Sequence, residues 1–266
     1  MNNISIANET IKITSDGFYE LNGQKVSLLS EDPKQVKIIS PKEGELLLNT
    51  DISQFQRDKL CSIEVTCESS FQAAARLDHP LVMNFANAHN PGGGFRMGAN
   101  AQEEALCRCS TLYASITSQE SKEMYHYNNT HPSFVESDYM LISPDVTVFR
   151  GDEYSLLEKP YLVDVVTVPA PNRYGAAFLA SKELVNKTIL RRIRIFLRYA
   201  AIKGINDLVL GAWGCGAFGN DPTKVAQQFR TALIDDGLGL CFERVVFAIY
   251  GKPDGKNISA FREVFK

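Results

Sequence analysis

Residues 81 to 116, LVMNFANAHNPGGGFRMGANAQEEALCRCSTLYASI, contain the signals for a strand, a glycine-rich turn and a helix in close succession. The run at 81–86 is apolar throughout, which is typical of a strand that is buried on both faces. Three glycines follow at 92–94. The stretch 101–116 then has two glutamates in its first turn, where a helix favours negative charge. The segment predicts one strand–turn–helix unit of an α/β fold.

Further strands and helices alternate after this unit. We expect strands at VDVVTVPA (163–170), DLVLGAW (207–213) and RVVFAIY (244–250), and helices at 182–202, at about 222–236 and in ISAFREVF (258–265). Apolar strands separated by helices indicate a three-layer α/β sandwich with a mixed, largely parallel sheet. In the helix at 182–202 we expect a solvated basic face that consists of Lys187, Arg191, Arg192, Arg194 and Arg198.

The N-terminal part has a different pattern. Residues 11–29 alternate apolar and polar around Asn22-Gly23, a strong signal for a β-hairpin. Helical spacing follows within 67–77. We therefore predict a hairpin and helical extension at 1–65, packed on a catalytic core at 66–266.

Composition limits the class of protein. The chain has 266 residues, 44% of them hydrophobic, which is enough for one sizeable core. A formal charge of −3 without a long basic run argues against direct nucleic-acid binding. No apolar stretch approaches the ~20 residues of a membrane span, and the polar N-terminus does not resemble a secretory signal. We expect a cytoplasmic protein that does not bind membranes.

The cysteines give no metal motif. Six cysteines without a secretory signal indicate reduced thiols. Their spacing includes no C-x-x-C pair, and no H-x3-H pair accompanies them. We expect neither a metal site nor a cofactor.

Two glycine-rich loops follow predicted strands. The first spans 84–104 and includes Gly92 to Gly94. The second, GAWGCGAFGNDP at 211–222, precedes a helix that starts at Asp221-Pro222. Glycine permits close backbone approach and positive φ, so that N–H groups can surround an anion. Either loop alone is also compatible with a flexible surface turn, but the pair predicts a diphosphate held from two sides. The G-x-G-x-x-G spacing of the second loop is a weak match to a dinucleotide fingerprint.

The two glutamates after the first loop are candidates for acid–base chemistry. Adjacent residues on a helix point about 100° apart, so Glu103 and Glu104 are not expected to share one task. The simplest alternative is that both only stabilise the helix dipole.

The pattern Gly-Gly-Gly, a short spacer and Gln-Glu-Glu resembles the signature of poly(ADP-ribose) glycohydrolases. Together with PAPN (169–172) and the second glycine loop, it is similar to the bacterial-type branch of that family over roughly residues 60–250. The resemblance implies a macrodomain-like fold that binds ADP-ribose and hydrolyses ribose–ribose O-glycosidic bonds. It also implies a monomer acting on poly(ADP-ribose) or an ADP-ribosylated protein.

The resemblance assigns roles to individual residues. Glu104 would be the catalytic residue and Glu103 would position the adjoining ribose. Asn87 would contact the ribose at the scissile end, the two glycine loops would enclose the diphosphate, and Phe218 would orient that ribose. The expected substrate-binding residues are Asn87, Gly92, Gly93, Gly94, Gln102, Gly214, Cys215, Gly216, Ala217, Phe218, Gly219 and Asn220.

The chemistry requires a carboxylic acid to protonate the leaving oxygen and then activate water, without a metal. A macrodomain that reads ADP-ribose without cleaving it, or a mono-ADP-ribosyl hydrolase, would share the loops. A phosphoester hydrolase would add a metal site. Cys215 with a histidine would make a thiol hydrolase, but no spacing links it to His79, His89, His126 or His131. A small residue in a tight loop explains Cys215 more simply.

Overall fold

The structure, a computed structural model, describes residues 2–266. Its strands are β1 (Phe18–Leu21), β2 (Gln24–Ser27), β3 (Lys37–Ile39), β4 (Ser62–Thr66), β5 (Leu81–Ala86), β6 (Met140–Arg150), β7 (Leu156–Pro169), β8 (Asp207–Leu210) and β9 (Arg244–Ala248). Its α-helices are α1 (Asn3–Asp16), α2 (Pro41–Asn49), α3 (Ser70–Ala74), α4 (Gln102–Cys109), α5 (Leu112–Ile116), α6 (Lys122–Thr130), α7 (Lys182–Ile202), α8 (Pro222–Arg230) and α9 (Lys256–Val264).

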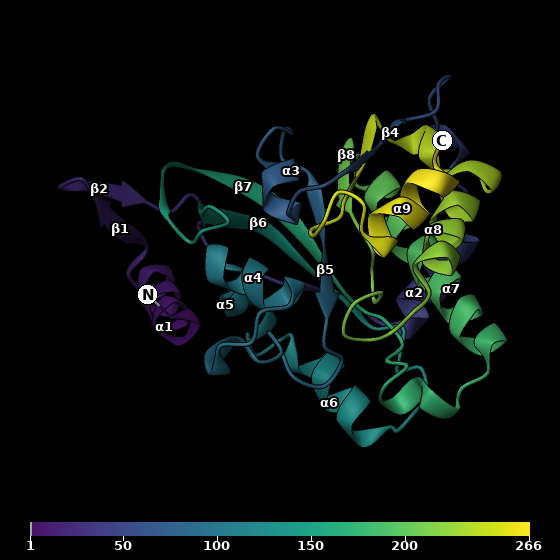
Figure 1. Ribbon diagram of the computed structural model, residues 1–266, viewed down its shortest axis with the longest axis horizontal. Helices are drawn as coiled ribbons and strands as arrows, with labels where there is room; N and C mark the ends of the chain where they lie inside the picture. Colours follow the sequence, from purple (N-terminus) through teal and green to yellow (C-terminus); the bar gives the residue numbers. More distant parts are fainter. Residues whose placement is uncertain (1) are drawn as a thin grey trace.

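A seven-stranded sheet with the order β3-β6-β7-β5-β8-β9-β4 forms the centre of the molecule (Figure 1). The neighbours of β5 and β9 are parallel to them, whereas β6 is antiparallel to both β3 and β7. The prediction of an α/β fold with a mixed, largely parallel sheet is confirmed.

Helices cover both faces of this sheet. One buried cluster lies between the sheet and α7, α8 and α9, and a second lies on the other face with residues of α3, α4 and α5. Figure 1 shows the first group of helices on one side of the strands and α4 and α5 on the other. Leu81 and Met83 of β5 face the first cluster, whereas Val82 faces the second. Burial on both faces explains why β5 is apolar throughout.

The β6–β7 hairpin is longer than the sequence indicates. The strand expected at 163–170 is the last part of β7, and β6 was not predicted. The register of β6 shifts between Ser143 and Val146, where Asp145 has a φ of +50°. This bulge places Pro144 and Asp145 in the middle of the strand, and these residues interrupt the strand pattern in the sequence.

The expectation of a solvated basic face on α7 is wrong for Arg192. Its side chain is 0% exposed and donates to Asp138 Oδ1 at 2.9 Å, to the Pro169 carbonyl at 2.9 Å and to the Glu136 carbonyl at 3.1 Å. Arg191 pairs with Asp138 and Glu45 at the surface. Arg192 therefore ties the end of β7 to the segment before β6.

The N-terminal part includes the predicted hairpin, with Asn22 and Gly23 both at positive φ. Residues 11–16, expected in that hairpin, instead end α1, which Asn2 caps and Gly17 terminates at φ +77°. β3 and β4 form the two edges of the central sheet. The proposed boundary at residue 65 therefore falls inside β4, and the division into 1–65 and 66–266 stays a prediction. No helix within residues 2–266 is both long and apolar enough to cross a bilayer.

Candidate active site

A cavity of about 550 Å³ opens at the carboxyl ends of the parallel strands. Phe85, Ala170, Ala212 and Ala248 line it from the ends of β5, β7, β8 and β9. The start of α4 and the second glycine loop form its walls. Ligands of open α/β sheets bind in this crevice, and the volume suits a small molecule.

Glu104 lies in the first turn of α4 and is 7% exposed. Its Oε1 accepts the Gly94 N–H and its Oε2 accepts the Ala101 N–H, both at 2.9 Å. Ala101 directly precedes α4, so this carboxylate also caps the helix. The two bonds fix Glu104 against the first glycine loop. Glu104, Glu103, Asn87 and Gly92–Gly94 do not themselves line the cavity, whereas the neighbouring Ala101, Gln102 and Ala105 do.

Glu103 is 3% exposed and points to the end of β5. Its Oε2 accepts the Asn87 N–H at 2.9 Å, and its Oε1 accepts Asn84 Nδ2 at 3.3 Å. Burial raises the pKa of Glu103 to about 8, although the hydrogen bonds from Asn87 and Asn84 oppose the shift. Glu103 therefore holds the loop through Asn87 and favours a protonated carboxyl group.

The triple glycine is shaped around this pair. Gly93 has a φ of +55°, and a Cβ atom there would overlap Glu104 Oε1 and lie 3.4 Å from Glu103 Oε2. A Cβ at Gly92 would lie 2.9 Å from the Tyr113 ring. These glycines thus allow the backbone to contact the two carboxylates. Their expected contact with a diphosphate stays a prediction.

Gln102 connects α4 to β5. Its Oε1 accepts the Phe85 N–H at 2.9 Å, while its Nε2 donates to the Met83 carbonyl at 2.8 Å and to Ser70 Oγ at 3.1 Å. Gln102 also lines the cavity. Both polar atoms of its side chain form hydrogen bonds within the protein, so Gln102 has the contacts of a residue that positions α4 against β5.

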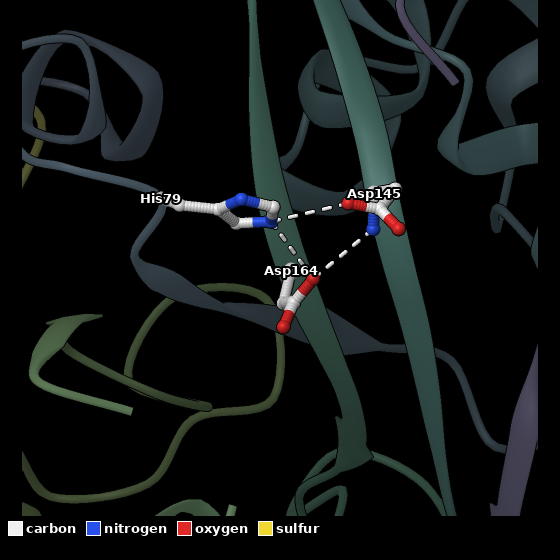
Figure 2. A group of neighbouring side chains, drawn as sticks. All are labelled: His79, Asp145 and Asp164. Atoms are coloured by element: carbon white, nitrogen blue, oxygen red, sulfur yellow. Dashed lines mark hydrogen bonds and ion pairs between the residues drawn. The ribbon is translucent and has the colours of Figure 1, made fainter. Parts of the chain in front are cut away.

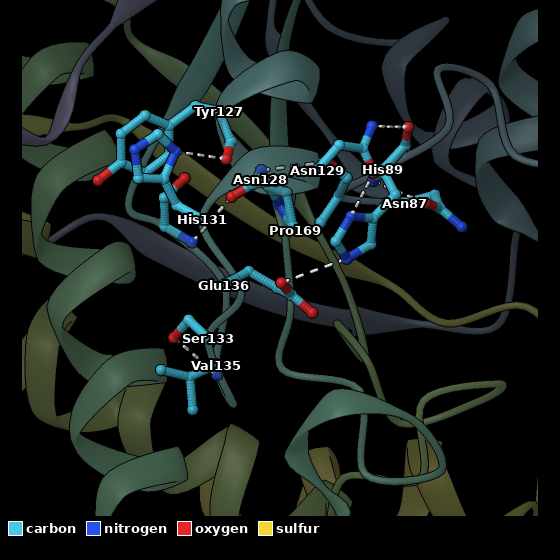
Figure 3. Close-up of polar contacts among 12 residues, drawn as sticks. Asn87, His89, Tyr127, Asn128, Asn129, His131, Ser133, Val135, Glu136 and Pro169 are labelled. Carbon is cyan, nitrogen blue, oxygen red and sulfur yellow. Dashed lines mark hydrogen bonds and ion pairs between the residues drawn. The ribbon is translucent and has the colours of Figure 1, made fainter.

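Asn87 begins the loop that follows β5, and a second layer of side chains supports it (Figure 3). Asn87 Oδ1 accepts the N–H groups of His89 and Asn90. His89 lies between Asn129 Oδ1, 3.0 Å from its Nδ1, and Glu136 Oε2, 3.3 Å from its Nε2.

This support joins distant parts of the chain. Asn128 Nδ2 donates to the Ala88 carbonyl at 3.1 Å, and Asn129 Nδ2 donates to the His89 carbonyl at 3.2 Å. Glu136 is buried, at a φ of +62°, and its carbonyl accepts Arg192. The sequence did not indicate Asn129 or Glu136 as partners of His89, because no local pattern links the loop to α6 and the segment after it.

The second glycine loop is held by Asn220. Its Nδ2 donates to the carbonyls of Pro171 and Gly214, at 2.9 and 3.1 Å. Gly214, Gly216, Ala217 and Phe218 line the main cavity. Gly219 and Asn220 instead line a smaller neighbouring pocket.

Cys215 does not have the environment of a nucleophile. Burial raises the pKa of its thiol to about 12, and the thiol donates to the Trp213 carbonyl at 3.6 Å. Within residues 2–266, no histidine side chain is hydrogen-bonded to Cys215. The thiol-hydrolase alternative therefore has no geometric support.

The comparisons with known proteins agree on one family. The family model for the microbial-type PARG catalytic domain matches residues 7–151. The structure of poly(ADP-ribose) glycohydrolase from Thermomonospora curvata is 37% identical, covers 99% of each chain and has a TM-score of 0.91. The same enzyme bound to the inhibitor ADP-HPD is 37% identical, with 98% of each chain covered and a TM-score of 0.89.

A Deinococcus radiodurans poly(ADP-ribose) glycohydrolase in complex with ADP-ribose is 38% identical, covers 87% of this chain and 94% of its own, and has a TM-score of 0.80. A comparison with curated protein sequences gives no match. The predicted macrodomain-like fold and the family resemblance are confirmed. With its Gln-Glu-Glu helix start set against a triple-glycine loop, the chain belongs to the microbial-type poly(ADP-ribose) glycohydrolase family.

Proposed function

We propose that this protein hydrolyses ribose–ribose O-glycosidic bonds of poly(ADP-ribose), releases ADP-ribose, and uses Glu104 as general acid and base. The observation that carries this proposal is the geometry of Glu104. Two backbone N–H groups fix its carboxylate against the first glycine loop, one turn from the cavity-lining Ala101 and next to the cavity-lining Ala105, and Gly93 has no side chain that would occupy the space of this carboxylate. The solved relatives with ADP-ribose or ADP-HPD bound support the choice of ligand.

The reaction proceeds in two proton transfers. Glu104 donates its proton to the leaving ribose oxygen as the C1–O bond breaks, because an alkoxide is a poor leaving group. The resulting carboxylate then accepts a proton from the water that attacks C1. Glu103 keeps Asn87 and the first glycine loop in place through the Asn87 N–H. No step needs a metal ion.

The ligand is arranged along the cavity. The diphosphate lies between Gly92–Gly94 and Gly214–Gly219. Backbone N–H groups of the second loop can donate hydrogen bonds to its oxygens, whereas the N–H groups of Gly93 and Gly94 donate to the Asn90 carbonyl and to Glu104 Oε1. Phe218 packs against the ribose next to Glu104. Asn87 contacts that ribose from the other loop.

We also infer a cytoplasmic monomer that does not bind nucleic acid directly. All six cysteines are free, which fits a reducing compartment. The net charge of −3 supports the absence of a nucleic-acid site. Size-exclusion chromatography with light scattering tests the monomer, and fractionation of cells tests the compartment.

Incubation with poly(ADP-ribose) in EDTA tests the activity. Chromatography should show free ADP-ribose from the wild type and from Glu120→Gln, an exposed acidic control. Polymer that binds but stays intact would indicate a reader. Turnover that EDTA abolishes and added metal restores would indicate the phosphoester-hydrolase class instead.

A further inference from the structure

Figure 2 shows a cluster of His79, Asp145 and Asp164, which lies at the start of β5, at the other end of this strand from the glutamate pair. His79 is in the turn before β5, Asp145 is in the bulge of β6, and Asp164 is in β7. β5 runs from Leu81, paired with Asp164, to Ala86 at the catalytic loop. At 3.3 Å per residue this separation is roughly 17 Å. The cluster is therefore distinct from the active site.

The three potential ligand atoms lie close enough together to contact one ion. His79 Nε2 lies 3.1 Å from Asp164 Oδ1 and 3.5 Å from Asp145 Oδ1, and all three groups lie within 4.8 Å of one another. Ligands at 2.0–2.1 Å from one ion are about 2.9 Å apart in octahedral and about 3.4 Å apart in tetrahedral geometry. Both distances from Nε2 fit such edges.

A hydrogen bond alone does not account for the charges. The single N–H at His79 Nε2 can serve one carboxylate well, and it faces two. Asp78, next to His79 in the chain, adds a further negative charge. Among the described residues, no lysine or arginine pairs with Asp145 or Asp164. Lys37 Nζ instead lies over the ring of Tyr199, 5.2 Å from the ring centroid. Negative charge is therefore left over for a dication.

The fold also fixes the positions of these groups. Asp164 Oδ1 accepts the Asp145 N–H at 3.0 Å, and the Asp164 N–H donates to the Pro80 carbonyl at 3.0 Å. The side chains of His79, Asp145 and Asp164 are 40%, 52% and 26% exposed. Water can therefore reach the cluster and complete a coordination sphere.

We propose that His79, Asp145 and Asp164 bind one divalent first-row transition-metal ion, with Zn²⁺ as the probe and water at the remaining positions. One imidazole with two carboxylates suits Zn²⁺ or Mn²⁺ better than Ca²⁺, which takes oxygen ligands alone. The ion ties the turn before β5 to β6 and β7. It stabilises the fold and takes no part in the hydrolysis.

Calorimetry on the untagged, EDTA-stripped full chain tests this site. Cys67→Ser is the background, because Cys67 is an exposed thiol that would itself bind Zn²⁺. We expect one Zn²⁺ per chain and little heat with Mg²⁺. At a hundredfold excess over Kd, the melting temperature should rise by about 5 °C.

His79→Ala and Asp145→Asn should each weaken Zn²⁺ binding at least tenfold and abolish the rise in melting temperature. Asp145 is the more exposed position, so its variant remains informative if His79→Ala folds poorly. His126→Ala, an exposed histidine on α6, is the matched control and should bind normally. Absence of binding at about 100 µM Zn²⁺, or equal binding by the wild type and both variants, overturns the proposal.

Discussion

Gly93 and Glu104 are in direct contact, and a Cβ atom on Gly93 would overlap Glu104 Oε1. A substitution at this glycine therefore displaces the carboxylate of Glu104, the proposed general acid. Gly93 also has a φ of +55°, which side chains disfavour. Gly93 therefore links the first glycine loop to the position of Glu104.

Gly93→Ala should lower kcat by more than 100-fold, since a displacement of about 1 Å can cost that much. Steady-state hydrolysis of poly(ADP-ribose), with circular dichroism to confirm the fold, measures the effect. Gly151→Ala is the matched control, because its Cβ would meet only ordinary contacts at 3.6 Å and beyond. Normal turnover by Gly93→Ala would show that the contact between Gly93 and Glu104 does not matter for hydrolysis.

Glu103→Gln should change the pH dependence of stability. The pKa of Glu103 is raised to about 8 in the folded chain, so between its ordinary value of 4.5 and 8 the folded state holds more protons than the unfolded state. Wild-type stability therefore falls as pH rises through this window, and Glu103→Gln removes that contribution.

Urea unfolding of the wild type and of Glu103→Gln at pH 5.5 and 7.5 measures this contribution of Glu103 to the free energy of unfolding. From the lower to the higher pH, the free energy of unfolding of the variant should rise by roughly 1–3 kcal/mol relative to that of the wild type. A constant difference would show that Glu103 is ionised when folded. Turnover should also decrease in the variant, because Glu103 accepts the Asn87 N–H.

His89→Ala should lower kcat/KM by about tenfold. The change removes the bridge from the first loop to Asn129 and leaves Glu136 buried without its partner. A double-mutant cycle with Glu136→Gln should show coupling, because the two side chains act through one contact. His126→Ala supplies the control. Additive effects of the two changes would show that the contact between His89 and Glu136 does not stabilise the first glycine loop.

Phe218→Ala should reduce kcat more than it weakens ADP-ribose binding. Phe218 lines the cavity next to Ala217, and its flat face is proposed to orient the ribose beside Glu104. Calorimetry and rates on this variant and on Phe178→Ala, an exposed phenylalanine, separate the two effects. An equal loss of affinity and rate would assign Phe218 to binding alone.

The sequence predicted those features that depend on neighbouring residues. The strand, the turn and the start of α4 were predicted because the apolar run, the glycines and the first-turn glutamates are adjacent in the chain. The α7 helix was predicted at its observed bounds for the same reason. The single helix expected over 101–116 is instead divided into α4 and α5, because Ser110 has an extended backbone and bridges to Val148 of β6.

Features that depend on tertiary partners were missed. Arg192 has the position of a surface arginine in sequence, but Asp138 and the Pro169 carbonyl bury it. Likewise, nothing near His79 indicates that Asp145 and Asp164 lie beside it. The central assignment of Glu104 came from a family pattern, and the structure adds the two N–H bonds that position it.

Glu104→Gln, measured for both affinity and rate, tests this assignment most directly. Gln keeps the shape of the side chain but cannot donate the proton, and its amide faces an N–H at Gly94 or Ala101, which should lower the melting temperature slightly. We predict that ADP-ribose binds within about tenfold of wild type, while single-turnover hydrolysis of poly(ADP-ribose) falls at least 1000-fold, within the range for loss of general acid catalysis. Retention of most of the rate with unchanged affinity would contradict the assignment of Glu104 as the general acid.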